Sequence, residues 1–337
     1  MTGADPSTAS PIFLLGNPRS GTTMVRLMLT SHRAIGIPPE SEFIVKLYSA
    51  FGHISSFSSQ QAQAFRAALS GEPINLAEQW EVSLDELIPS DRELIGMDYA
   101  TVCASIYQSY QAAKGLPRTE MWGDKNNAYG QYVDLLASLF PKAKFIHLVR
   151  DGRAVLNSYR KLEVSADKKY APLLPQNASM VALRWRDAVE RIERHLKRYA
   201  PDRSISLRYE DVLADPEGQS RRLCDFLGLE YDPDMLEFHT KNAEQGLEPR
   251  SYSWKANTFQ PLDAQKGAKW LSELCQEDLK AFEAVARPLL VDQGYEPTTP
   301  NAAGRSGSLK FAFLATTREY LRHLRVLLVN ARKRLTG

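Results

Sequence analysis

Short apolar segments alternate with longer segments of helical periodicity along most of this chain. The apolar segments lie at residues 12–15, 120–122, 144–149 and 204–207. The helical segments lie at residues 24–29, 94–113, 128–139, 179–199, 217–227 and 277–293. Strands that are buried on both faces of a parallel sheet read as continuous apolar runs, and the helices that cover the sheet come between them. The pattern therefore predicts an α/β fold with a parallel central sheet flanked by helices.

Three stretches interrupt this alternation. Residues 164–178 and 244–267 are irregular and polar, which is typical of substrate lids or of disorder. Residues 298–308 have the composition of a linker, and from residue 308 the periodicity predicts one long amphipathic helix. We expect a main domain over residues 1–300, followed by a linker and a helix over residues 301–337.

The C-terminal segment is basic, although the net charge of the whole chain is only +2. From residue 301 onward there are eight Lys or Arg residues and a single Glu. Arg318, Arg322, Arg325 and Arg332 recur at helical spacing on one face. Such a helix packs on the domain or on a second subunit, or it lies on an anionic membrane surface. The rest of the chain is slightly acidic, so we expect no nucleic-acid partner.

Composition narrows the class of protein. A hydrophobic fraction of 43% with 24% charged residues is that of a globular protein with a substantial core. Cys103, Cys224 and Cys275 are widely spaced and form no Cys-x-x-Cys or Cys/His cluster, so we expect buried, reduced thiols and neither a metal site nor disulfides. The polar N-terminus and the absence of an apolar run of about 20 residues favour a cytoplasmic protein, with membrane association through the C-terminal helix left open.

Residues 16–23, Gly-Asn-Pro-Arg-Ser-Gly-Thr-Thr, have the spacing of a phosphate-binding loop between a strand and a helix. In nucleotide triphosphatases a Lys follows the second Gly, and the next hydroxyl binds Mg²⁺. Here Thr22 replaces that Lys, and Arg19 supplies a cation from inside the loop. Backbone amides at the start of the helix remain suited to an anion. The loop therefore predicts an anion smaller than a triphosphate, bound without a metal.

A second candidate anion site follows the strand at residues 144–149. Arg150 comes directly after that strand, and Ser158 follows two helical turns later. In an open α/β sheet, residues after the carboxyl ends of strands converge on ligands. Together with the loop at residues 16–23, these residues indicate a ligand with two separated anionic groups.

These residues resemble a known family, the sulfotransferases that use 3′-phosphoadenosine 5′-phosphosulfate (PAPS). The resemblance covers about residues 11–296. It includes Pro-Arg-Ser-Gly-Thr-Thr at residues 18–23, the Arg150 and Ser158 pair, the Tyr-Glu-Asp segment that begins at Tyr209, and the Lys-Trp pair that begins at Lys269. It implies a P-loop-NTPase-like sulfotransferase fold, PAPS as co-substrate, PAP as product and no metal. The implied cofactor-binding residues are Arg19, Ser20, Gly21, Thr22, Thr23, Arg150, Ser158, Tyr209 and Lys269.

Within that family the chain looks closer to the tyrosylprotein and bacterial sulfotransferases than to the cytosolic phenol and steroid enzymes. Arg26 to His32 match Arg-x-Met-Leu-x-x-His, and an acidic residue follows. The resemblance implies Glu40 as the general base, with Lys125 and Arg19 stabilising the reacting and departing groups. Glu42 is the alternative base, because the motif here reads Pro-Glu-Ser-Glu.

The resemblance leaves several points open. A Ser that contacts PAPS in the family has Ser253 as its nearest candidate here. The acceptor is a hydroxyl of unknown class, and related enzymes form homodimers. His147, inside a predicted buried strand, is expected to be a hydrogen-bonded core residue rather than a base.

Three other interpretations compete with the enzyme hypothesis. A P-loop kinase or nucleotide hydrolase would use Asp151 as a metal ligand. A non-catalytic PAP- or PAPS-binding protein would use the fold without chemistry. In an assembly protein the C-terminal helix would be the functional segment.

Overall fold

The structure is a computed structural model that describes residues 10–72, 74–116, 121–165, 175–248 and 253–300. The predicted helix over residues 301–337 lies outside the described residues. The chain divides into two compact units, the first formed by residues 1–150 and 189–264, the second by residues 151–188 and 265–337. Each unit is described by itself.

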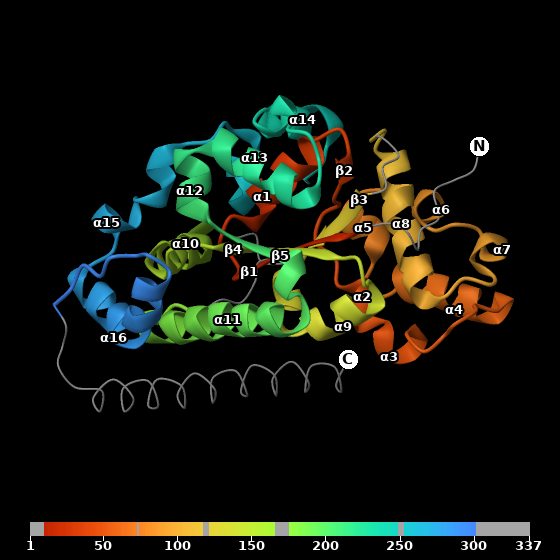
Figure 1. Cartoon of the computed structure of the whole chain (residues 1–337), viewed down its shortest axis with the longest axis horizontal. Helices are drawn as coiled ribbons and strands as arrows, with labels where there is room; N and C mark the ends of the chain where they lie inside the picture. The colour runs from red at the N-terminus through yellow and green to blue at the C-terminus, as the bar shows by residue number, and fades with distance from the viewer. Residues whose placement is uncertain (1–9, 73, 117–120, 166–174, 249–252, 301–337) are drawn as a thin grey trace. The chain divides into compact units, whose positions relative to one another are not determined.

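A five-stranded parallel sheet forms the centre of the first unit (Figure 1). Its strands are β1 (Ile12–Gly16), β2 (Ile35–Gly36), β3 (Met121–Lys125), β4 (Lys144–Val149) and β5 (Ser204–Arg208), in the spatial order β2-β3-β1-β4-β5. Every pairing between neighbouring strands is parallel. All carboxyl ends therefore meet at one edge of the sheet. β1 pairs with β3 on one side and β4 on the other, which is the arrangement that creates a ligand crevice beyond the strand ends.

Helices surround this sheet. Those of the first unit are α1 (Thr22–Ser31), α2 (Phe43–Lys46), α3 (Tyr48–Phe51), α4 (Ser59–Ser70), α5 (Leu76–Trp80), α6 (Leu84–Leu87), α7 (Asp91–Leu94), α8 (Tyr99–Ala113), α9 (Val133–Leu139), α12 (Tyr209–Ala214), α13 (Pro216–Leu227) and α14 (Phe238–Gln245). Its short 3₁₀ helices are η2 (Asn127–Gln131), η3 (Pro201–Arg203), η4 (Pro233–Met235) and η5 (Ser253–Phe259). Helices α2 to α8 gather beside β2 and β3 (Figure 1).

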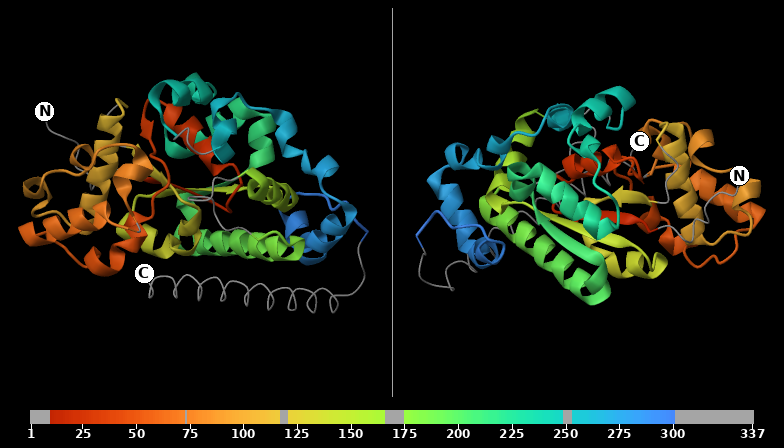
Figure 2. Two further views of the ribbon diagram at one scale, coloured as in Figure 1. Left: turned by 180° about the vertical axis from the view of Figure 1, so that it is seen from behind. Right: turned by 45° about the horizontal axis from the view of Figure 1, so that its top comes forward.

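The second unit is helical. It contains α10 (Gly152–Ser165), α15 (Trp270–Glu273) and α16 (Gln276–Asp292), and α10 contacts both of the others (Figure 2). α11 (Ala178–Tyr199) belongs to the second unit up to residue 188 and to the first beyond it, and η6 (Ala264–Gly267) also starts in the first.

The sequence pattern predicted four of the five strands and most of the long helices. Asp215 caps α13 by accepting a hydrogen bond from the amide of Gly218, and Gly294 follows α16 with a φ of 74°. The helix predicted over residues 94–113 begins only at Tyr99, because Asp98 caps it there. The helix predicted over 128–139 is divided into η2 and α9. β2 was missed, since two residues carry no periodicity.

Aromatic side chains fill the core between the sheet and the inserted helices. Tyr107 of α8 stacks on Trp122 of β3 with ring centroids 4.3 Å apart, and Phe43 stacks on Tyr107 at 5.5 Å. Trp80 packs against the same tyrosine at 5.4 Å. Phe43 and Trp80 are therefore core residues.

Two sequence expectations need correction. Cys103 and Cys224 are buried free thiols as expected, but Cys275 is exposed because it precedes the first turn of α16 on the surface. His147 is buried as predicted, yet neither ring nitrogen has a hydrogen-bond partner among the described residues. Burial lowers the pKa of His147 to about 3, so the ring is neutral.

The described part of the chain lacks two kinds of feature. It contains no group of three or more side chains suited to a metal ion. None of its helices is both long and apolar enough to cross a membrane.

Candidate active site

The phosphate-loop residues lie where β1 ends and α1 begins. Arg19 has a φ of 69° and Gly21 a φ of 91°, so the backbone turns sharply there. A side chain at position 21 would also be excluded, because its Cβ would lie 2.4 Å from the ring of Tyr209. The Ser20 hydroxyl is buried and has no hydrogen-bond partner among the described residues. A buried, unpaired hydroxyl beside the first amides of a helix, which have no partner within the helix, fits an anionic ligand.

Arg150 and Tyr209 meet this loop from the ends of β4 and β5. The Arg150 guanidinium lies 4.4 Å from the centre of the Tyr209 ring, and its Nη1 donates to the carbonyl of Arg19 across 3.0 Å. Burial raises the pKa of the Tyr209 phenol, although Arg150 and Arg19 oppose the shift. The structure thus brings Arg19, Gly21, Arg150 and Tyr209 together.

Glu40 and Lys125 form an ion pair at the same edge of the sheet. Lys125, the last residue of β3, donates from Nζ to Glu40 Oε2 across 2.5 Å. The lysine side chain is only 2% exposed, whereas the glutamate side chain is 34% exposed. The other oxygen, Oε1, accepts the amide of Asn127 across 3.1 Å. A buried cation therefore sits beside a carboxylate that solvent reaches.

Glu42 has different surroundings. Its carboxylate pairs with Lys46 one helical turn later, at 3.0 Å, and both side chains are more than a third exposed. This is an ordinary surface i,i+4 pair on α2. Of the two glutamates in the sequence motif, only Glu40 contacts Lys125.

The segment that leads to Glu40 is fixed from both sides. Buried Arg26 of α1 donates to the carbonyl of Ile37 across 2.8 Å and forms an ion pair with Glu248 at 2.5 Å. On the far side, Asn126 Nδ2 donates to the carbonyl of Ser41 across 2.5 Å. In the sequence, Arg26 is recognisable only as a motif residue, and no local pattern distinguishes Asn126.

A buried carboxylate lies directly behind this pair. Asp124 precedes Lys125 on β3 and accepts the hydroxyl of Tyr107 across 2.6 Å. Burial raises the pKa of Asp124 to about 7, although hydrogen bonds from Tyr107 and Tyr129 act in the other direction. An acidic residue inside an apolar strand was the signal that could have singled it out.

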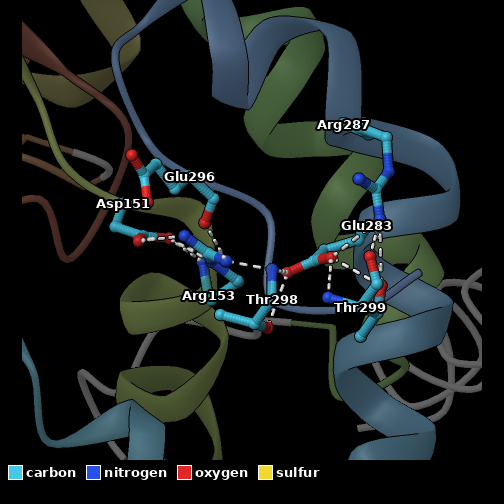
Figure 3. A network of polar contacts seen from close by, with 7 residues as sticks. All are labelled: Asp151, Arg153, Glu283, Arg287, Glu296, Thr298 and Thr299. Carbon is cyan, nitrogen blue, oxygen red and sulfur yellow. Dashed lines mark hydrogen bonds and ion pairs between the residues drawn. The ribbon is translucent and has the colours of Figure 1, made fainter. Parts of the chain in front are cut away.

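Ser158 and Lys269 belong to the second unit, on α10 and directly before α15. A buried network fixes the first turn of α10 there (Figure 3). Arg153 forms ion pairs with Asp151 at 2.8 Å and with Glu283 at 2.7 Å. Its guanidinium also lies 4.0 Å from the ring centre of Trp270, the residue after Lys269.

The same network reaches the last described residues. Glu283 accepts the amide of Thr298 across 2.8 Å and the amide and hydroxyl of Thr299 across 2.9 and 2.6 Å. Residues 298 and 299, which the composition had assigned to a linker, are therefore bonded to α16 (Figure 3). The side chain of Ser253 lies outside the described part of the chain.

Comparison with known proteins gives consistent matches. The model of the sulfotransferase family matches residues 11–233. Protein-tyrosine sulfotransferase A of Caenorhabditis elegans is 23% identical over 295 residues, covering 86% of this chain and 68% of that protein. An omega-hydroxy-beta-dihydromenaquinone-9 sulfotransferase of Mycobacterium tuberculosis is 25% identical, covering 74% of this chain and 72% of that protein.

A solved structure shows that the fold is shared. The sulfotransferase domain of the olefin synthase from Synechococcus PCC 7002 superposes with a TM-score of 0.58 at 21% identity. The match covers 89% of this chain and all of that domain.

Proposed function

The chain belongs to the sulfotransferase family, and from that premise we propose which of its residues bind the sulfuryl donor and which act on the acceptor. The predictions of an α/β sulfotransferase fold and of an enzyme that transfers a sulfuryl group from PAPS are confirmed at the level of the family. The residue roles below are our own proposal.

We assign the donor's 5′-phosphosulfate to the loop at residues 16–23. The buried Ser20 hydroxyl, the backbone amides from Gly21 to Thr23 and the Arg19 side chain would bind its oxygens. Arg150 and Tyr209 would bind the 3′-phosphate and the adenine end, since both lie against the same loop. Ser158 and Lys269 are assigned to the 3′-phosphate by the family resemblance alone. When bound, PAPS supplies an activated sulfuryl group.

Glu40 is our candidate for the general base, and its ion pair with Lys125 is the observation that carries the proposal. A carboxylate that is one-third exposed can reach an acceptor hydroxyl from solvent and take its proton. Lys125 and Arg19 would offset the negative charge that develops between the transferred group and the departing phosphate. Transfer would need no metal in this scheme.

The alternatives find less support in the site. A nucleotide kinase or hydrolase needs a Lys at the position of Thr22, and its candidate metal ligand Asp151 is engaged by Arg153. A non-catalytic PAP-binding protein has no use for a carboxylate paired with a buried lysine beside the loop. The hydroxyl acceptor, a cytoplasmic location, a homodimer and the role of residues 301–337 stay predictions from the sequence.

The test compares ligands on the full chain. PAP, ATP and ADP are each titrated with and without Mg²⁺, and thermal unfolding is followed. A ligand present at 100 times its Kd adds about 2.7 kcal/mol to stability, which is readily seen. We expect PAP to stabilise most, independently of Mg²⁺; preference for ATP with Mg²⁺ would overturn the proposal. Labelled PAPS with a panel of phenolic, lipid, sugar and peptide hydroxyls then identifies the acceptor class.

A further inference from the structure

One residue, Asn127, contacts both the phosphate loop and Glu40, and the mechanism above does not use it. Thr22 donates its hydroxyl to Asn127 Oδ1 across 3.2 Å. The backbone amide of Asn127 donates to Glu40 Oε1 across 3.1 Å. Asn127 is 105 positions from Thr22 and 87 from Glu40, so only the fold brings the three together.

The local structure explains why this amide is available. Asn127 is the first residue of η2, and the first amides of a helical turn have no partner inside that turn. Asn126 satisfies the next amide, that of Ala128, across 2.9 Å. The Glu40 carboxylate therefore takes the amide of Asn127, while Lys125 takes the other carboxylate oxygen.

Thr22 stands where a nucleotide triphosphatase has its phosphate-binding Lys. Its side chain is buried, is too short to reach along a ligand, and is directed at Asn127. A hydroxyl has a single hydrogen, which Thr22 gives to Asn127. Thr22 is also the first residue of α1, so an anion on the loop amides fixes its backbone. When Thr22 is held in place, its hydroxyl holds the side chain of Asn127. The backbone amide of Asn127 in turn holds one carboxylate oxygen of Glu40.

We propose that Asn127 is a positioning residue that couples occupation of the phosphate loop to the orientation of Glu40. This inference rests on the proposed function, in which the loop binds the donor and Glu40 acts as base. Its benefit is in alignment, because a displacement of about 1 Å in a reacting group costs about 100-fold in rate. At the position where a nucleotide triphosphatase has its Lys, the side chain thus serves positioning here, while the backbone amide of Thr22 binds the donor.

A purely structural role for Asn127 makes a different prediction. If the contacts only stabilise the turn after β3, their loss lowers thermal stability without separating turnover from donor binding. Coupling predicts instead that turnover falls while PAP affinity stays. It also predicts that the Asn127 amide responds to a ligand on the loop only when residue 22 carries a hydroxyl.

Three variants of the full chain test this: Thr22→Val, Thr22→Ser as its matched control, and Asn127→Ala. The first readout is the amide resonance of residue 127 as PAP is added, which requires no acceptor. We expect PAP to shift it in the wild type and in Thr22→Ser but not in Thr22→Val. An equal shift in Thr22→Val would overturn the proposal.

The second readout separates kcat from PAP affinity, using whichever hydroxyl of the panel accepts sulfate. Asn127→Ala should lower kcat about 10- to 100-fold with the Kd of PAP within threefold of wild type. Adding Thr22→Val to Asn127→Ala should lower kcat little further, since both substitutions remove the same hydrogen bond between Thr22 and Asn127. Unchanged kcat, or equal losses in kcat and affinity, contradicts the inference.

Glu40→Gln, measured alongside, distinguishes the assignment of Glu40 as general base from the coupling role of Asn127. If Glu40→Gln is inactive and Asn127→Ala is fully active, only the coupling is wrong. If Glu40→Gln keeps full activity, the base assignment fails and the coupling fails with it.

Discussion

Nζ of Lys125 lies 2.5 Å from Oε2 of Glu40 at the carboxyl edge of the sheet, and the lysine side chain is buried whereas the carboxylate is partly exposed. The two come from different segments, the end of β3 and the loop that follows β2. A buried ion pair costs desolvation energy and is weak evidence for stability on its own. Its position beside the phosphate loop instead favours a role in chemistry.

The first prediction concerns this pair. Glu40→Gln keeps the shape of the side chain but cannot take a proton at neutral pH, so kcat should fall by about 10²–10⁴. PAP affinity, measured by calorimetry, should stay within a few-fold. Glu42→Gln is the matched control, because Glu42 forms a surface ion pair with Lys46. Loss of activity in the control with retention in Glu40→Gln would assign the base to Glu42.

The second prediction uses two glycines with nearly equal φ angles. Gly21 has a φ of 91° and Gly96 a φ of 89°, so alanine at either position is strained by about 1–2 kcal/mol. Only at position 21 would the new Cβ also meet a neighbour, the ring of Tyr209, at 2.4 Å; nothing lies within 4 Å at position 96. Gly21→Ala should lose more stability than Gly96→Ala, because its Cβ also meets the Tyr209 ring, and Gly21→Ala alone should lose PAP affinity. Equal PAP affinity in both variants would separate Tyr209 from the donor site.

The third prediction addresses the 3′-phosphate. Arg150→Met removes the cation that lies over Tyr209, so the preference for PAP over adenosine 5′-monophosphate should fall about 10- to 100-fold. Arg203→Met is the control, because Arg203 precedes β5 at the opposite edge of the sheet and donates to the carbonyl of Ala143. Competition binding of the two nucleotides gives both ratios. A preserved preference in Arg150→Met would assign the 3′-phosphate to other residues.

The sequence predicts those strands and helices whose pattern lies in consecutive residues, and it misses those that depend on contacts between distant segments. β1 is a continuous apolar run and β4 is apolar except for Lys144 and His147, because these strands are buried on both faces, and such runs are visible in any sequence. β2 has two residues and is defined only by its pairing with β3, so no local pattern could reveal it. The start of α8 was missed because Leu94, Ile95 and Met97 extend the apolar pattern to positions before the capping residue Asp98.

The residues of the candidate site also divide into those with a local sequence pattern and those defined by long-range contacts. Arg19, Thr22 and Arg150 were found because they follow strands at recognisable spacing. Asn127 was missed because a polar residue in a turn looks like any other until the fold brings Glu40 to its amide, 87 positions away. The buried Arg26–Glu248 pair, separated by 222 positions, was beyond sequence reasoning for the same reason.

The last prediction concerns acid stability and the network in Figure 3. Burial alone would raise the pKa of Glu283, but hydrogen bonds from Thr298 and Thr299 outweigh it and lower the pKa to about 2. A carboxyl whose pKa is lower in the folded state stabilises the fold fully above its ordinary value of 4.5. That contribution is lost as the pH falls from 4.5 to 2.

Glu283→Gln should therefore cost about 3–5 kcal/mol at pH 7, because it removes the negative charge that pairs with buried Arg153 and with partly exposed Arg287. The gap to wild type should narrow between pH 4.5 and 2, by up to about 1.4 kcal/mol per pH unit, since wild type alone must protonate this group. Urea unfolding of both proteins across that range measures the gap. Glu277→Gln, at an exposed glutamate of the same helix, should run parallel to wild type. If the difference in unfolding free energy between wild type and Glu283→Gln stayed constant over this pH range, folding would not lower the pKa of Glu283.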